Sequence, residues 1–306
     1  MTIRFDGKVA IVTGGGNGLG RQHCLQLAAR GAKVVVNDLG GAVDGTGGSV
    51  SAAQAVADEI NKGGGQAIGN GADITKLDQV EAMVAEAKAK WGRVDILINN
   101  AGILRDKTFA KMTMDDFKKV VDVHLFGTAN CTKAVWETMR EQNYGRIVMT
   151  SSASGIYGNF GQANYGAAKA AMIGLMNVLS QEGAKNNIRV NTLAPTAATR
   201  MVEGLVPEQV GKLMGPELVS PGVLFLVSDD APTKTILGAG AGSFSVVHIY
   251  ETPAVFLGGE KTTCDDVAAN WKKISDPTNE EPIEAAFAQT NRFVAAAAAA
   301  LGVKLG

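Results

Sequence analysis

Three polar residues in the middle of the chain have types and spacing that could move a proton on or off an alcohol. Ser152 precedes Tyr165 by thirteen positions, and Lys169 follows Tyr165 by four. On a helix, the four-residue spacing places the tyrosine and the lysine on one face, one turn apart. A phenol with a pKa near ~10 exchanges protons poorly at neutral pH, but a nearby ammonium stabilises the phenolate and lowers that pKa. We therefore predict Tyr165 as the proton acceptor, Lys169 as its activator and Ser152 as a hydrogen-bond donor to the substrate oxygen.

A second motif, near the start of the chain, favours this interpretation over an ordinary amphipathic helix. Val9–Val12 is an apolar run typical of a buried parallel strand, and a glycine-rich turn, Thr13–Gly20, follows it directly. A helical pattern then runs to Gly31. Glycines at such a turn let the backbone approach a pyrophosphate, which binds at the positive N-terminus of the helix. The strongly patterned flanks disfavour the alternative of a flexible linker. The predicted cofactor contacts of this turn are Gly14, Gly16, Asn17, Gly18, Leu19 and Gly20.

Asp38 ends the next predicted strand, eighteen residues after Gly20. A carboxylate there can accept hydrogen bonds from the ribose hydroxyls of adenosine, and it repels a 2′-phosphate. No Arg or Lys follows at once, because Leu39 and Gly40 come next. Asn17 occupies a loop position where NADP-dependent enzymes often carry a basic residue. We therefore predict NAD, and not NADP, as the cofactor.

With both motifs in place, residues 5–250 resemble the short-chain dehydrogenase/reductase family. Asp73 matches the family's acid beside the adenine ring, and Asn99–Gly102 matches its Asn-Asn-Ala-Gly turn near the cofactor. Asn191–Pro195 matches the strand and turn near the nicotinamide, where the family usually has Pro-Gly. The resemblance implies further cofactor contacts at Asp73, Ile74, Asn100, Ala101, Gly102, Pro195 and Ala197, with Tyr165 and Lys169 also touching the cofactor.

One position departs from the family pattern. The family's proton relay commonly uses an Asn in the long helix after the Asn-Asn-Ala-Gly turn, and His124 stands there in this chain. His124 is therefore a candidate catalytic residue. The alternative is a buried helix residue whose ring bonds a backbone carbonyl.

The segment around His124 and three other segments resemble one particular group within the family. Residues 40–49, 99–109, 123–128 and 150–165 are similar to the dehydrogenase unit of peroxisomal multifunctional enzymes of type 2. That unit oxidises (3R)-3-hydroxyacyl-CoA with NAD and also handles some 17β-hydroxysteroids. The chain is too short for the hydratase and sterol-carrier domains, so the resemblance implies a stand-alone relative of bacterial type.

Strand and helix patterns alternate along the chain, which predicts an α/β fold of Rossmann type with a doubly wound parallel sheet. The predicted strands are 8–13, 33–38, 66–70, 94–98, 146–151 and 189–194, with a last strand after Gly238. The predicted helices are 19–30, 49–62, 76–90, 113–142 and 163–184. Ligands bind at the carboxyl ends of the strands in such sheets, so the motifs above should meet there.

The predicted domains are an NAD-binding domain, 1–255, and a helical C-terminal extension, 256–306. Residues 196–217 follow a strand end and are predicted to form a substrate lid with the apolar side chains Met201, Leu205, Val206, Val210 and Leu213. In the extension, Thr263 and Asp266 are spaced to cap a helix, and a second helix is predicted over Glu280–Leu301. This Ala-rich helix should pack on the same domain or on a partner subunit, and we expect a homodimer or homotetramer.

Composition excludes several other classes of protein. The net charge of −1 over 306 residues gives no electrostatic case for nucleic acid. No apolar run is long enough to span a bilayer, and the N-terminus has no signal-peptide pattern. The three cysteines are widely spaced, which indicates reduced thiols, and no Cys/His cluster predicts a metal. We expect a cytoplasmic protein without a metal ion.

The sequence leaves three functions open. The first is (3R)-3-hydroxyacyl-CoA oxidation, for which Arg105, Lys107, Lys111 and Arg200 are candidate contacts to the phosphates of coenzyme A. The second is hydroxysteroid oxidation of the 17β type, which needs only an apolar slot. The third is a non-catalytic NAD sensor, which the intact Ser152, Tyr165 and Lys169 disfavour.

Overall fold

The computed structural model describes residues 2–198 and 207–305. The chain divides into two compact units, Met1–Val246 and Val247–Gly306, whereas the predicted domain boundary lies at residue 255. The part of the predicted lid that covers residues 199–206, with Arg200, Met201, Leu205 and Val206, lies outside the described residues.

The first unit is built on one large, mostly parallel sheet. Within the described residues, eight strands join in the order β3-β2-β1-β4-β5-β6-β7-β8. The strands are β1 Val9–Thr13, β2 Lys33–Asn37, β3 Gln66–Asn70, β4 Ile96–Asn99, β5 Gly145–Thr150, β6 Ile188–Thr196, β7 Ile236–Gly240 and β8 Ser243–Val247. The pairs from β3 to β7 are all parallel. This is the predicted Rossmann-type α/β fold.

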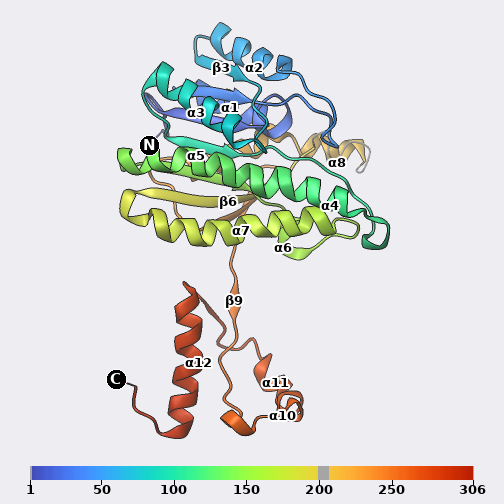
Figure 1. Cartoon of the computed structure of the whole chain (residues 1–306), viewed down its shortest axis with the longest axis vertical. Helices are drawn as coiled ribbons and strands as arrows, with labels where there is room; N and C mark the ends of the chain where they lie inside the picture. Colours follow the sequence, from blue (N-terminus) through green and yellow to red (C-terminus); the bar gives the residue numbers. More distant parts are fainter. Residues whose placement is uncertain (1, 199–206, 306) are drawn as a thin grey trace. The chain divides into compact units, whose positions relative to one another are not determined.

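Helices cover both faces of this sheet (Figure 1). They are α1 Gly18–Ala29, α2 Ser51–Lys62, α3 Leu77–Trp91, α4 Met114–Val121, α5 Gly127–Gln142, α6 Ala153–Tyr157, α7 Ala163–Gly183, α8 Glu208–Leu213 and α9 Ser220–Leu226. Helices α1, α2 and α9 pack on one face, while α3, α5 and α7 cover the other. Across the described part of the chain, no helix combines the length and apolarity that a membrane span requires.

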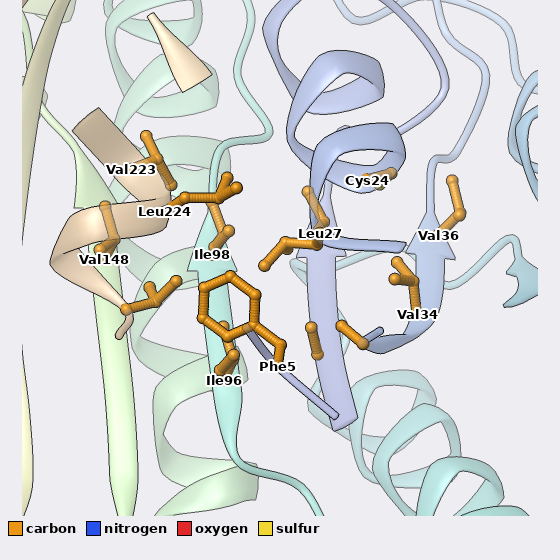
Figure 2. Packing of buried hydrophobic residues seen from close by; sticks show 14 of the residues in the cluster. Phe5, Cys24, Leu27, Val34, Val36, Ile96, Ile98, Val148, Val223 and Leu224 are labelled. Atoms are coloured by element: carbon orange, nitrogen blue, oxygen red, sulfur yellow. The ribbon is translucent and has the colours of Figure 1, made fainter. Parts of the chain in front are cut away.

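The central strands are mostly apolar because helices cover both faces of the sheet there. All five residues of β1 are buried. Ala10 and Val12 of β1 pair in register with Val34 and Val36 of β2 and with Ile96 and Ile98 of β4. These residues belong to one buried cluster, in which Val34, Val36, Ile96 and Ile98 lie near Leu27 of α1 and Val223 and Leu224 of α9 (Figure 2). Burial of these side chains provides the main driving force for holding α1 and α9 against the sheet.

The helix predicted over 113–142 contains a π-helical turn. α4 ends at Val121, the turn η2 spans Asp122–Phe126, and α5 begins at Gly127. Single π turns within α-helices are rare and are frequently found at functional sites. Here the turn carries His124, whose side chain is buried.

The second unit is small and contains the predicted helical extension. Its elements are β9 Tyr250–Glu251, η5 Gly259–Lys261, α10 Cys264–Ala269, α11 Trp271–Ile274, β10 Glu281–Pro282 and α12 Ala286–Leu301. Thr263 and Asp266 form the predicted capping box at the start of α10. The predicted terminal helix begins at Ala286 rather than Glu280, because Glu281-Pro282 pairs with Tyr250-Glu251 as a short strand.

A buried histidine between α1 and α9 should make the stability of the first unit depend on pH. His23 of α1 is fully buried, and its Nδ1 lies 2.7 Å from Oγ of Ser220 in α9. Burial lowers the pKa of His23 to about 3. In the unfolded chain the imidazole has a pKa near ~6.5, so on acidification the unfolded state takes up the proton first.

The contribution of His23 to the free energy of unfolding should be complete above pH 6.5 and decrease as the pH falls toward 3. In the wild type, the uptake of about one proton on unfolding should change the free energy of unfolding by ~1.4 kcal/mol per pH unit in this range. A His23→Gln variant cannot titrate at this position and should lack this part of the pH dependence. Urea unfolding at pH 7 and pH 5 measures the difference, with His248→Gln at an exposed histidine as control. Equal pH dependence in wild type and His23→Gln would contradict this assignment.

Candidate active site and cofactor groove

A cavity of about 480 Å³ opens where the parallel strands end. Because the strands are parallel, the residues that follow β1, β2, β4 and β5 arrive at the same edge of the sheet. Most of the predicted site residues line this cavity: Gly14, Asn17, Gly18, Leu19, Asp38, Asp73, Ile74, Asn100, Ala101, Gly102, His124, Ser152, Tyr165, Lys169, Pro195 and Ala197. Gly16 and Gly20 are not among the lining residues, and they lie in the turn between β1 and α1.

The glycine turn is shaped by close backbone contacts that no side chain could occupy. A Cβ on Gly20 would lie 2.0 Å from the carbonyl oxygen of Gly14, and a Cβ on Gly14 would lie 2.8 Å from Cα of Ala101. Gly14 also has a φ of 64°, in the left-handed region that favours glycine. These contacts bring the start of α1 directly against the turn after β4.

Hydrogen bonds fix the turn after β4 to the glycine turn. The backbone N–H groups of Asn100 and Ala101 donate to Oγ1 of Thr13, at 3.0 and 3.1 Å. The Asn100 side-chain amide donates to the carbonyl oxygens of Thr13 and Gly14, at 3.0 and 3.1 Å. Asn100 therefore supports the wall of the groove, and its predicted contact with the cofactor stays a prediction.

The N-terminus of α1 fits the pyrophosphate of a dinucleotide. Asn17 is the N-cap residue, and its side chain makes no capping hydrogen bond. The first N–H groups of a helix have no partner within the helix, and their positive end attracts anions. Since Asn17, Gly18 and Leu19 all line the cavity, these donors lie where a phosphate could reach them.

Asp38 is held as a fixed acceptor at the end of β2. Its Oδ2 accepts from the N–H of Gly16 at 2.9 Å, and its Oδ1 accepts from the N–H of Gly40 at 2.7 Å. These two backbone donors fix the orientation of the carboxylate. The side chain therefore presents a negative charge to the groove.

The predicted adenine side of the groove is formed by the turn after β3. Oδ1 of Asp73 accepts from both the N–H and the hydroxyl of Thr75, at 2.9 and 2.8 Å. The Ile74 side chain is buried, and its carbonyl accepts from Nδ2 of Asn130. The Asp73 carboxylate thus caps a local turn in addition to lining the cavity.

Tyr165 and Lys169 lie one turn apart on α7, as the spacing predicts. Nζ of Lys169 lies 5.5 Å from the centre of the Tyr165 ring and donates to the carbonyl oxygen of Thr150 at 2.6 Å. Ser152, the N-cap residue of α6, hydrogen-bonds the Tyr165 hydroxyl and also accepts from the N–H of Ser154. The three predicted catalytic side chains therefore share one corner of the cavity.

The pKa of Tyr165 is shifted in the opposite direction to the one predicted from the sequence. Burial raises the pKa of Tyr165, and the Asp106 charge adds to the rise, while the hydrogen bond from Ser152 opposes it. Burial also lowers the pKa of Lys169 to about 7. The predicted acidified phenol is thus wrong for this arrangement, because the desolvated Tyr165 has its cationic neighbour directed at a backbone carbonyl.

His124 packs against Tyr165, with ring centroids 5.2 Å apart in an edge-to-face arrangement. Its Nε2 lies 2.9 Å from the carbonyl oxygen of Ile103 and 3.1 Å from the N–H of the same residue. One ring nitrogen can serve only one of these partners at a time, depending on the tautomer. Burial, helped by the Lys169 charge, lowers the pKa of His124, so the ring is neutral at neutral pH. Its relay role stays a prediction.

A polar network beside the catalytic corner was missed from the sequence. Nε2 of Gln162 donates to Oδ2 of Asp106 at 2.6 Å, and its Oε1 accepts from the Ser154 hydroxyl at 2.7 Å and from Nδ2 of Asn159 at 3.1 Å. All four residues line the cavity. Gln162 precedes Tyr165 by three positions, and this short distance in the sequence could have indicated that it lies near the catalytic residues.

The remaining wall comes from the segment after β6. Pro195, Thr196 and Ala197 line the cavity, together with Met214 after α8. The N–H of Ala198 donates to the carbonyl oxygen of Met214 at 2.6 Å, which joins the two described ends of the predicted lid. Val210 and Leu213 of the lid are exposed.

Comparison with known proteins agrees with this arrangement. The chain matches the short chain dehydrogenase family over residues 8–209. It is 46% identical to peroxisomal multifunctional enzyme type 2 of Mus musculus, over 90% of this chain and 38% of the mouse protein. It is 43% identical to a putative short-chain type dehydrogenase/reductase of Mycobacterium tuberculosis, over 88% of this chain and 94% of that protein.

A solved structure shows the same likeness. Full-length peroxisomal multifunctional enzyme type 2 from Drosophila melanogaster matches with a TM-score of 0.81 and 35% identity, over 98% of this chain and 51% of that chain. The chain spans less than two thirds of the length of these multifunctional relatives. From the family match, the strand order and the shared strand-end cavity, the chain belongs to the short-chain dehydrogenase/reductase family of oxidoreductases.

Proposed function

We propose that the protein oxidises (3R)-3-hydroxyacyl-CoA to 3-oxoacyl-CoA with NAD. The observation that carries the proposal is that Ser152, Tyr165 and Lys169 line the same cavity as the glycine turn and Asp38. A hydride acceptor can then act on the carbon of an alcohol while a proton acceptor acts on its hydroxyl group. The likeness to the multifunctional enzymes supports the acyl-CoA substrate, through the dehydrogenase unit that the sequence resembles.

The fixed carboxylate of Asp38 supports NAD over NADP. Both of its oxygens accept backbone N–H groups, so the side chain cannot easily turn away from a 2′-phosphate. The repulsion would act on NADP, whereas the ribose hydroxyls of NAD could donate to the same oxygens. The uncapped start of α1 would hold the pyrophosphate, and Tyr165 and Lys169 would contact the nicotinamide ribose.

The catalytic side chains have separate tasks in alcohol oxidation. Tyr165, as phenolate, accepts the proton of the substrate hydroxyl. Ser152 donates a hydrogen bond to the substrate oxygen and holds it against Tyr165. When bound, NAD supplies the electron-pair chemistry, because its nicotinamide accepts the hydride of the alcohol carbon.

The Gln162 network supports a substrate with two oxygens. A 3-hydroxyacyl thioester carries its carbonyl oxygen close to the reacting hydroxyl, whereas a 17β-hydroxysteroid has no second oxygen there. One N–H of Gln162 donates to Asp106, and the amide has a second N–H to offer. Donation to the thioester carbonyl would fix the acyl chain relative to Tyr165.

The predicted contacts to the phosphates of coenzyme A are only partly supported. Arg105 and Lys107 both pair with Asp116, at 3.1 and 3.7 Å. Lys111 is exposed, and Arg200 lies outside the described residues. Lys119 lines the cavity and adds a cation that the sequence analysis missed.

Alcohol oxidation should become faster at alkaline pH because the pKa of Tyr165 is raised. We expect kcat/KM for the alcohol to increase about tenfold per pH unit between pH 7 and pH 9, following the phenolate fraction. Tyr165→Phe should lower kcat by a factor of at least ~10² at each pH, and Tyr250→Phe in the second unit serves as control. A flat profile in the wild type would exclude Tyr165 as the titrating base.

Gln162→Leu should separate the two candidate substrates. We expect kcat/KM for (3R)-3-hydroxybutyryl-CoA to fall about 10- to 100-fold, since the substrate carbonyl loses its donor. Gln181→Leu, on the exposed far end of α7, should leave the value unchanged. The same assays with estradiol test the steroid alternative. A wild-type preference for estradiol would overturn the acyl-CoA proposal, and an equal loss on both substrates would show that Gln162 acts only by packing.

A further inference from the structure

The long connection between β2 and α2 forms one wall of the cofactor cavity. We name residues 40–49 the cofactor flap. Gly41, Ala42, Val43 and Gly45 of the flap line the cavity together with the glycine turn of β1. The flap contains five glycines, and Gly40, Gly45 and Gly47 have positive φ. Glycine adopts positive φ without the strain that a Cβ atom would add, so these three positions suit a tightly turned backbone.

Hydrogen bonds hold the two ends of the flap against the residues that follow β2, whereas different bonds hold its tip. At its base, the N–H of Gly40 donates to Asp38, and the N–H of Ser49 donates to the carbonyl oxygen of Leu39. Inside the tip, Asp44 accepts from the N–H and hydroxyl of Thr46. These bonds shape the flap without fixing its tip to the rest of the unit.

Within the described residues, two hydrogen bonds join the tip, residues 42–46, to the rest of the unit. The N–H of Leu104 donates to the carbonyl oxygen of Val43 at 2.9 Å, and Nε of Arg105 donates to the carbonyl oxygen of Asp44 at 2.9 Å. The second bond is charge-assisted and therefore the stronger of the two. Arg105 is thus the principal attachment of the tip.

Arg105 is itself held in place from two other directions. Its Nη1 pairs with Oδ1 of Asp116 in α4 at 3.1 Å. Its carbonyl oxygen accepts from Nδ2 of Asn164, whose Oδ1 accepts the N–H of Tyr165 at 2.7 Å. One residue therefore contacts the flap through its side chain and the catalytic helix through its main chain.

We propose that Arg105 is a positioning residue that holds the cofactor flap closed over the bound dinucleotide and so limits its dissociation. The inference rests on the proposed function in that the dinucleotide is taken to be NAD. With the bond to Asp44 removed, the tip should open more often, and the cofactor should leave faster. Arg105 is thus assigned to holding the flap. Its guanidinium group is already bound to the Asp116 carboxylate and to the main-chain carbonyl of Asp44, so it is poorly placed to bind coenzyme A.

Lys107 provides a matched control for the charge of Arg105. It pairs with the same carboxylate of Asp116, at 3.7 Å, and none of its described bonds reaches the flap. Replacing either residue by glutamine removes one positive charge beside Asp116. Only the replacement of Arg105 removes a bond to the flap tip.

The test compares wild type, Arg105→Gln and Lys107→Gln without acyl-CoA. Stopped-flow fluorescence measures NADH dissociation, and hydrogen exchange measures the amides of residues 41–48 with and without NADH. Arg105→Gln should release NADH about tenfold faster and exchange these amides faster, whereas Lys107→Gln should match wild type. Circular dichroism and thermal unfolding establish that both variants are folded.

If both variants release NADH equally fast, or if Arg105→Gln exchanges its flap amides like wild type, Arg105 does not hold the flap and the inference is overturned. If wild type binds NADPH in preference to NADH, the proposed cofactor is wrong. The exchange of the flap amides in the protein alone still tests Arg105 in that case.

Discussion

The site depends on the parallel pairing of the central strands. β1 pairs with β2 and β4, and β5 pairs with β4 and β6. Parallel strands end at one edge of the sheet, so the residues after each strand meet there although they are far apart in sequence. The bonds between Thr13 and the Asn100 turn then fix two of these ends against each other. The groove for the cofactor and the corner for the substrate both result from this convergence.

Burial sets the chemistry of the catalytic corner. It makes the phenolate of Tyr165 and the ammonium of Lys169 both costly, so each pKa moves toward its neutral form. Ser152 partly offsets this cost through its hydrogen bond to the phenol. The resulting site holds a proton on Tyr165 at neutral pH, which suits ketone reduction, and releases it at alkaline pH, which suits alcohol oxidation.

Local patterns were enough to predict the fold and to select residues that share one cavity, while the catalytic and cofactor-binding roles of these residues stay predictions. The apolar run of β1, the glycines after it and the Tyr165–Lys169 spacing each indicate one element and its neighbour, and the predicted Rossmann-type fold is confirmed. The raised pKa of Tyr165 could not be predicted, because it depends on burial by distant segments. For the same reason the π turn at His124 and the attachment of the flap to Arg105 have no local signature. The predicted oligomeric state and cytoplasmic location stay predictions.

We infer that an alcohol carbon beside Tyr165 gives its hydride directly to a nicotinamide in the groove. The most direct measurement uses (3R)-3-hydroxybutyryl-CoA with deuterium at C3, followed by proton NMR of the NADH formed. We predict deuterium at C4 of the nicotinamide and a lower kcat/KM than with the unlabelled substrate. Formation of the oxo product with the deuterium lost to water would contradict the account.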